Sequence, residues 1–460
     1  MPIRMKTRSA ADSKALFEAV PMVISQMVVL VYNMADTWFI GQTGDPAQVA
    51  ALTVTYPVFM LLNAVSNLFA VGGGSLVSRQ LGRGDLERAG RTATATIWMA
   101  AGSAVCFALV MAVVGGPMLG LLGARGDVAR FAWHYLVFAC MVGAPFTILN
   151  LVMAAIVRAE GKSSIASIGM CLGVAVNMVL APLLIFVAGL QVAGAALATA
   201  LSNAVGLAFL LAYVVRHRAD AMVRMSVLPK PIPGADVRAI VAVGLPAALV
   251  IILSSVSNSA MVRFLSSQPT EVLSGMGVMQ RLETIPFQLI MGISDGVIPL
   301  VAYTFASGDH RRMRAAIRTT LGVGFVSSVA CLLIYQLFAD GLVGLFIDEP
   351  TVVIYGARFL RLRSLALPSI VIEFMLIAVF QATGSTKPAM VLSLLRKGTI
   401  DLPLMALANL IWPLYGLMLV QPLMETVGAL VAGAFYRAIG RTNPIATPRK
   451  TPRALLAKIS

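Results

Sequence analysis

The sequence predicts an all-α polytopic membrane protein, with twelve transmembrane helices in two six-helix lobes related by an axis along the membrane normal. Three observations predict this fold. Of the 460 residues, 58% are hydrophobic and only 12% are charged, and apolar stretches of about twenty residues recur from end to end. Basic residues cluster in alternate short loops. Finally, the second half of the chain repeats the first.

Turn and charge signals separate the apolar runs into twelve spans. The spans begin near Phe17, Ala50, Ala93, Phe131, Ile165, Val192, Ile240, Val272, Leu321, Phe359, Ala389 and Leu414. The loops after even-numbered spans are rich in arginine, such as Arg83, Arg158 and Arg312, so both termini are expected in the cytoplasm. Arg396 and Lys397, inside the eleventh span, do not fit this scheme.

The repeat divides the chain at a proline-containing linker. Pro21 and Asn33 match Pro246 and Asn258 at an offset of 225 residues, and Gly206 matches Gly428 at 222. We therefore predict an N-lobe (1–215), a cytoplasmic linker (216–238), a C-lobe (239–437) and a basic cytoplasmic tail (438–460). Six spans per repeat place both halves in the membrane in the same direction, an architecture typical of transporters.

The first span carries a carboxylate, Asp36, near its outer end. A carboxylate at membrane depth costs a few kcal/mol and normally faces a protein cavity. On a helix, Gln26, Asn33, Asp36 and Thr37 share one face, beside Tyr32. This polar stripe predicts a functional cavity wall. The alternative is that Asp36 is a buried structural residue that hydrogen-bonds two helices together.

Other motifs exclude several classes of protein. The four cysteines lie in apolar stretches without ligand-like spacing, which indicates no disulfide framework and no metal site. Gly161-Lys162-Ser163 lacks the upstream glycine of a phosphate loop. No other nucleotide-binding or hydrolase motif appears, so transport, if that is the function, would be driven by an ion gradient. We expect no cofactor. The net charge of +15 reports topology in a chain this apolar, and no nucleic-acid partner is expected.

Gly84-Asp85 and Gly308-Asp309 are interpreted as turns that cap the next helix.

Four segments are informative together. They are Asn33-Met34-Ala35-Asp36-Thr37 running into Gly41-Gln42, Gly84-Asp85, Asn177-Met178-Val179-Leu180-Ala181-Pro182, and Phe380-Gln381-Ala382-Thr383-Gly384-Ser385-Thr386-Lys387-Pro388. With these segments the chain resembles, over nearly its whole length, the multidrug and toxic compound extrusion (MATE) transporters, and within them the bacterial and archaeal DinF-like branch. The resemblance implies two six-helix lobes around a V-shaped cavity, and export of organic cations against protons or sodium.

The resemblance also implies roles for individual residues. Asp36 would take up the coupling ion, Pro21 would mark the bend of the first helix, and Asn177 and Thr199 would be polar partners. Asn33 completes this predicted coupling site. Ala181 stands where members with the fullest N-lobe site have a second carboxylate, which argues for a proton over sodium. The repeat position of Asp36 in the C-lobe is Met261.

Several further polar residues lie at apparent membrane depth. Glu373 replaces Asn150 at the matched repeat position, and Glu425 replaces Asn203; Glu283 and Asp401 lie at similar depth. These acids either bind cationic substrate or hydrogen-bond within a lobe. The candidate substrate- or cavity-lining residues are Gln26, Tyr32, Asn150, Asn258, Glu283, Glu373 and Gln381.

The sequence thus predicts a monomeric antiporter of the bacterial inner membrane that is not an enzyme. It would exchange protons for amphipathic organic cations by alternating access of the two lobes within the lipid bilayer. The alternatives are sodium-coupled export and a flippase for lipid-linked oligosaccharides, which would favour a basic cavity. A membrane-embedded transferase would need a cluster of histidine and acids, which the sequence does not offer.

Overall fold

The structure, a computed structural model, is built from long helices. It describes residues 24–25, 27–28, 39–40, 42, 46–122, 124–217, 223, 232–265, 268–347, 349–395 and 400–442. The first half contains α2 (Pro46–Gly82), α3 (Leu86–Leu121), α4 (Gly126–Leu136), η1 (Val137–Val142), α5 (Ala144–Ala159), α6 (Ser163–Pro182), η2 (Leu183–Val187) and α7 (Gln191–Arg216). The second half contains α8 (Gly234–Leu265), α9 (Thr270–Ala306), α10 (His310–Gly344), α11 (Pro350–Ser364), α12 (Leu367–Thr383), α13 (Thr386–Leu394), α14 (Asp401–Ile411) and α15 (Tyr415–Thr442).

Within the described part of the chain, eight helices are long and apolar enough to cross a membrane. Two bent pairs, α4–η1 with α5 and α11 with α12, pass the same test when each is taken as one span. The predicted starts of spans nine and ten, at Leu321 and Phe359, were wrong by several residues. These helices begin at His310 and Pro350. In α10 the first turns are polar and capped by Asp309, so they are helical without being apolar and hydropathy does not detect them.

The two bent pairs occupy equivalent places in the repeat. The helix axes turn by 47° between η1 and α5, and by 46° between α11 and α12. A proline stands at the start of the second helix in each pair, Pro145 in α5 and Pro368 in α12. Proline lacks the N–H that would continue the hydrogen bonding of the preceding helix, so it favours a break at this point. The repeat seen in the sequence therefore has a counterpart in the helix geometry.

The two Gly-Asp turns also match, which confirms that they are helix caps. Gly84 and Gly308 both have φ of +78°, a left-handed conformation that favours glycine. The Asp85 carboxylate accepts a hydrogen bond from the Arg88 backbone N–H at 3.1 Å, and Asp309 accepts one from Arg312 N–H at 3.0 Å. Each carboxylate satisfies a free donor at the start of the following helix.

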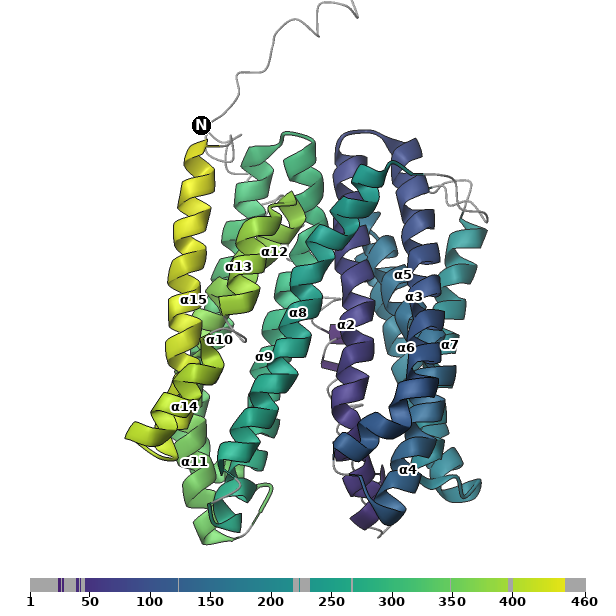
Figure 1. Ribbon diagram of the computed structural model, residues 1–460. Helices are drawn as coiled ribbons and strands as arrows, with labels where there is room; N and C mark the ends of the chain where they lie inside the picture. The colour runs from purple at the N-terminus through teal and green to yellow at the C-terminus, as the bar shows by residue number, and fades with distance from the viewer. Residues whose placement is uncertain are drawn as a thin grey trace, which may run out of the picture.

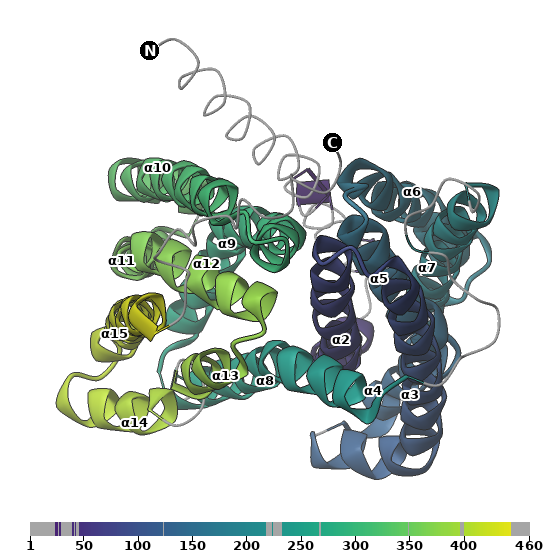
Figure 2. The same ribbon diagram turned by 90° about the horizontal axis from the view of Figure 1, so that it is seen from above.

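Helices of the two halves form two groups that lie side by side (Figures 1 and 2). The groups approach each other at the end that carries the Gly-Asp turns, at the top of Figure 1, and diverge toward the opposite end. At the close end, α2 and α8 cross at Gly72 and Gly244. A Cβ atom on Gly72 would overlap the Ile240 carbonyl of α8, and one on Gly244 would overlap the Leu68 carbonyl of α2.

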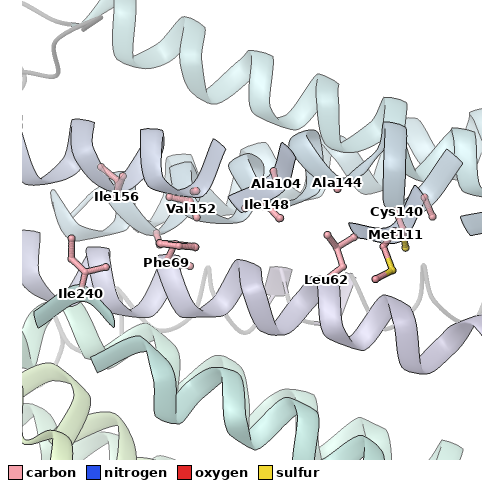
Figure 3. Packing of buried hydrophobic residues seen from close by; sticks show 14 of the residues in the cluster. Leu62, Phe69, Ala104, Met111, Cys140, Ala144, Ile148, Val152, Ile156 and Ile240 are labelled. Atoms are coloured by element: carbon pink, nitrogen blue, oxygen red, sulfur yellow. The ribbon is translucent and has the colours of Figure 1, made fainter. Parts of the chain in front are cut away.

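The largest core cluster shows how closely the halves are joined at this crossing. Most of its buried side chains come from α2, α3, α4, η1 and α5, and Ile240 of α8 packs beside Phe69 and Ile156 at one end (Figure 3). Val223, from the predicted linker, belongs to the same cluster. Its backbone N–H donates to the Glu160 carboxylate at 3.0 Å. Burial raises the pKa of Glu160, whereas this hydrogen bond acts in the opposite direction.

Candidate functional site

The predicted first-span site lies outside the described residues. This applies to Pro21, Gln26, Tyr32, Asn33 and Asp36. Their roles stay predictions. The structure does describe the surroundings that the sequence predicted for them in the fifth and sixth spans, and it describes the candidate residues of the C-lobe.

A continuous polar track runs through the N-lobe. The Asn177 side-chain amide on α6 donates to Thr199 Oγ1 on α7 at 3.3 Å, and both residues are buried. One turn further along α7, Asn203 Nδ2 donates to the Thr199 backbone carbonyl at 3.0 Å. Asn150 Nδ2, on α5, donates to Asn203 Oδ1 at 3.0 Å. Three helices therefore place Asn177, Thr199 and Asn150, all singled out from the sequence, in one hydrogen-bonded network.

This track is made of neutral groups. Amides and hydroxyls both donate and accept, so they hydrogen-bond a carboxyl in either protonation state without fixing which state is present. Ala181, where a second acid was missing from the motif, is fully buried and packs in an apolar cluster with Ile185 and Val192. The described part of the N-lobe thus offers hydrogen-bond partners at this place but no second carboxylate.

The C-lobe holds an ion pair instead. Glu283 on α9 accepts hydrogen bonds from Arg363 Nη2 on α11 at 2.8 Å and from Gln421 Nε2 on α15 at 3.0 Å. The side chains of Arg363 and Glu283 are only 9% and 16% exposed. Arg363 Nη1 also lies 3.7 Å from the sulfur of Met261, the residue that matches Asp36 in the repeat. A fixed cation therefore lies beside the position that corresponds to the N-lobe carboxylate.

Glu373 and Glu425 are buried acids of the C-lobe, with exposed fractions of 0% and 1%. Glu373, on α12, lies directly against Gly428 of α15, and a Cβ atom there would overlap its carboxylate. In the N-lobe, Gly206 lies in the same way against Asn150, whose Oδ1 would be 3.1 Å from such a Cβ. The repeat has kept the glycine that makes room for the polar side chain and has replaced the amide by an acid.

Asp401 begins α14 and is almost completely buried. Its Oδ2 accepts a short hydrogen bond from Ser257 of α8, while its Oδ1 is buried without a hydrogen-bond partner in the structure. Asp401 joins α14 to the helix that forms most of the contact with the other lobe.

The two remaining candidates lie at different places. Asn258 accepts a hydrogen bond from Gln280 Nε2 at 2.7 Å, on an exposed part of α8 and α9. Gln381 lies at the boundary between the lobes, where its backbone carbonyl accepts a hydrogen bond from Ser75 Oγ of α2 at 2.7 Å. The structure therefore gives Gln381 a contact between the lobes rather than a place beside the C-lobe acids.

Charged residues at the close end of the lobes were not predicted as functional. Arg88 of α3 forms a two-point ion pair with Asp236 of α8, at 2.8 and 2.9 Å. Arg158 of α5 attracts Asp295 of α9. Nothing in the sequence indicated either pairing, because arginines in these loops are accounted for by topology alone.

The described residues contain no group of three or more His, Cys, Asp or Glu side chains suited to a metal ion. What they present is hydrogen-bonding capacity in one lobe, acids and an ion pair in the other, and a polar contact between the lobes at one end. Side chains of these types can hydrogen-bond polar solutes and attract cations.

Comparisons with known proteins agree with this architecture. The MatE family model matches the chain twice, over residues 21–183 and 246–407. Multidrug export protein MepA of Staphylococcus haemolyticus is 30% identical over 430 residues, which cover 92% of this chain and 93% of the relative. MepA of Staphylococcus saprophyticus subsp. saprophyticus is 31% identical over 414 residues, with 90% and 91% covered.

Solved structures show the same fold. A mutant of the Vibrio cholerae MATE transporter VcmN superposes with a TM-score of 0.89 at 21% identity, over 96% of this chain and 99% of that one. A MATE family transporter described as outward-facing superposes with a TM-score of 0.87 at 23% identity, over 95% and 96%. These matches confirm the predicted fold class of twelve helices in two lobes.

Proposed function

This chain belongs to the MATE family of transporters, and we propose that it exports amphipathic organic cations in exchange for protons. The family consists of transporters and not enzymes. The observation that carries the proposal is similarity to multidrug export proteins over nine-tenths of both chains. The coupling ion and the charge of the substrate are argued from the residues below.

The distribution of acids supports cationic substrates. Glu373, Glu425 and Asp401 are buried in the C-lobe, and an acid at membrane depth is expensive unless a proton or another cation compensates its charge. Arg363, a buried arginine of the same lobe, is paired with Glu283. A flippase for lipid-linked oligosaccharides would instead need unpaired basic residues that hold a diphosphate, so the acids favour the export of cations.

Proton coupling rests on the missing second carboxylate. Sodium prefers several oxygen ligands around it, and carboxylates supply them best. Ala181 removes one such group, and the amides and hydroxyls of Asn177 and Thr199 remain. A single carboxyl at Asp36 is sufficient for a proton, because a proton needs only one bond to oxygen.

Alternating access would follow from differential affinity. If the two lobe arrangements hold the Asp36 proton with different affinities, protonation shifts the equilibrium between them, and a substrate with the opposite preference is moved outward. The structure has its lobes together at the end with the Arg88–Asp236 ion pair. In the proposed orientation this end is cytoplasmic, so the arrangement corresponds to an outward-facing state in the bacterial inner membrane.

Reconstitution into proteoliposomes tests the proposal. Uptake of a fluorescent lipophilic cation is measured with a proton gradient alone, and then with a sodium gradient alone at clamped pH. We expect transport with the proton gradient and little with sodium. The matched variant Ala181→Asp restores the missing acid and is expected to gain sodium dependence. Strong sodium-driven transport by the unaltered chain would overturn proton coupling, and no transport of any cation would overturn the proposed substrate class.

A further inference from the structure

An apolar groove of about 590 Å³ runs between α14 and α15. Both helices lie on the side of the C-lobe away from the N-lobe (Figure 2). Leu404, Ala408 and Trp412 line one side of it, and Gly416 and Leu423 line the other. Almost all of its wall is hydrocarbon. The groove is outside the candidate site described above.

The groove has the length of one acyl chain in one leaflet. It extends along α15 from Gly416 to Thr426, and at 1.5 Å per residue this is about 15 Å. That length is half of a hydrocarbon core about 30 Å thick. Its outer end coincides with Trp412 and Tyr415, whose rings lie 6.0 Å apart. Tryptophan and tyrosine favour the level of the lipid headgroups.

A cation stands at the same end. Arg358 of α11 is exposed, and its Nη1 donates to the Tyr415 hydroxyl at 3.0 Å. Among the residues that the structure describes, no carboxylate lies within ion-pair distance of Arg358, whereas nearby Arg361 is paired with Asp340. The guanidinium of Arg358 thus keeps its full charge and several free N–H donors, which match the oxygens of a phosphate.

We propose that this groove is a binding site for an anionic phospholipid, with one acyl chain between α14 and α15 and the headgroup phosphate on Arg358. In the orientation proposed above, the lipid belongs to the outer leaflet. Only the choice of leaflet rests on that orientation. The site also bears on transport, because Asp401, at the inner end of α14, is hydrogen-bonded to Ser257 of α8, and a lipid that packs on α14 stabilises this connection.

Quenching of Trp412 by brominated lipids tests the site directly. The chain has four tryptophans, and Trp38, Trp98 and Trp133 are replaced by phenylalanine. The protein is reconstituted in mixtures of brominated phosphatidylglycerol or brominated phosphatidylcholine with the unbrominated lipid. We expect phosphatidylglycerol to bind beside Trp412 about fivefold more strongly than phosphatidylcholine, the effect of one surface cation on an anionic lipid.

Two variants and one control locate the effect. Arg358→Gln is expected to bring the preference close to one, and Ala408→Phe, which fills the groove, to reduce quenching by both lipids. Arg125→Gln is the matched control, because Arg125 is also exposed at this end of the molecule but lies in the N-lobe. It is expected to keep the preference. Equal quenching by the two lipids, or a preference that survives Arg358→Gln, would overturn the proposal.

Native mass spectrometry gives a second readout with all four tryptophans present. Retention of one phosphatidylglycerol molecule in preference to phosphatidylcholine, lost in Arg358→Gln and kept in Arg125→Gln, supports the site. Equal retention of the two lipids would contradict the lipid site. It would not contradict the proposed export function, because lipid retention is measured without a transport substrate.

Discussion

The C-lobe holds an ion pair, Arg363 with Glu283, at the depth where the N-lobe is predicted to hold a single carboxyl. The N-lobe is predicted to carry a lone carboxyl at Asp36, whereas the matching Met261 contacts Arg363, which is paired with Glu283. Glu283 also accepts a hydrogen bond from Gln421 of α15. We therefore infer that the N-lobe exchanges the proton, whereas the ion pair of the C-lobe stabilises the packing of its helices.

Removing one partner of this pair is expected to be costly. Arg363→Met would leave Glu283 as an uncompensated buried charge and lower stability by about 3 kcal/mol. The double variant Arg363→Met with Glu283→Gln removes both charges and is expected to recover most of this loss. Thermal unfolding in detergent, followed by intrinsic fluorescence, measures both. If the double variant were as unstable as the single one, the loss of stability would come from lost side-chain packing and not from the unpaired charge of Glu283.

The crossing of α2 and α8 shows how an element, rather than a side chain, joins the lobes. Gly72 and Gly244 allow the two backbones to meet, and this contact needs two glycines at matching heights. The sequence contains 39 glycines, so composition alone did not single out these two. The turn glycines Gly84 and Gly308 were predictable because aspartate follows each of them, which together with glycine is typical of a capped turn.

Gly244→Val is expected to separate the lobes at the crossing, because the added side chain would overlap the Leu68 carbonyl. Spin labels at Glu87 and Arg311, both exposed near this end, report the change by electron–electron double resonance. We expect a shift toward longer distances. Gly102→Val is the matched control, since a Cβ at Gly102 meets nothing within 4 Å. An unchanged distance in Gly244→Val would show that the crossing does not hold the lobes together.

At the scale of the whole molecule, most of the fold could be predicted from the sequence, but the contacts between the lobes could not. Hydropathy, arginine placement and the repeat are local or periodic signals, so they identify spans and symmetry. The ion pair of Arg88 with Asp236 joins residues 148 positions apart, and one sequence contains no record of such a pairing. For the same reason Glu283 was predicted as a candidate substrate residue, while its partner Arg363 was not noticed.

The orientation in the membrane is tested by labelling. Single cysteines at Asp85, Pro229 and Asp309, in a chain whose four native cysteines are replaced, are expected to react with an impermeant thiol reagent only from the cytoplasmic side. Reaction from outside at any of the three would reverse the assignment of inner and outer ends, and with it the leaflet proposed for the lipid.

The central claim is that Asp36 carries the exchanged proton, and substrate-induced proton release measures this most directly. Asp36→Asn keeps the size and hydrogen bonding of the side chain but cannot exchange a proton. In lightly buffered detergent solution, addition of a lipophilic cation is expected to release protons from the unaltered protein and from Asn258→Ala, but not from Asp36→Asn. Undiminished proton release by Asp36→Asn, in a protein that is folded and binds the substrate, would contradict the account.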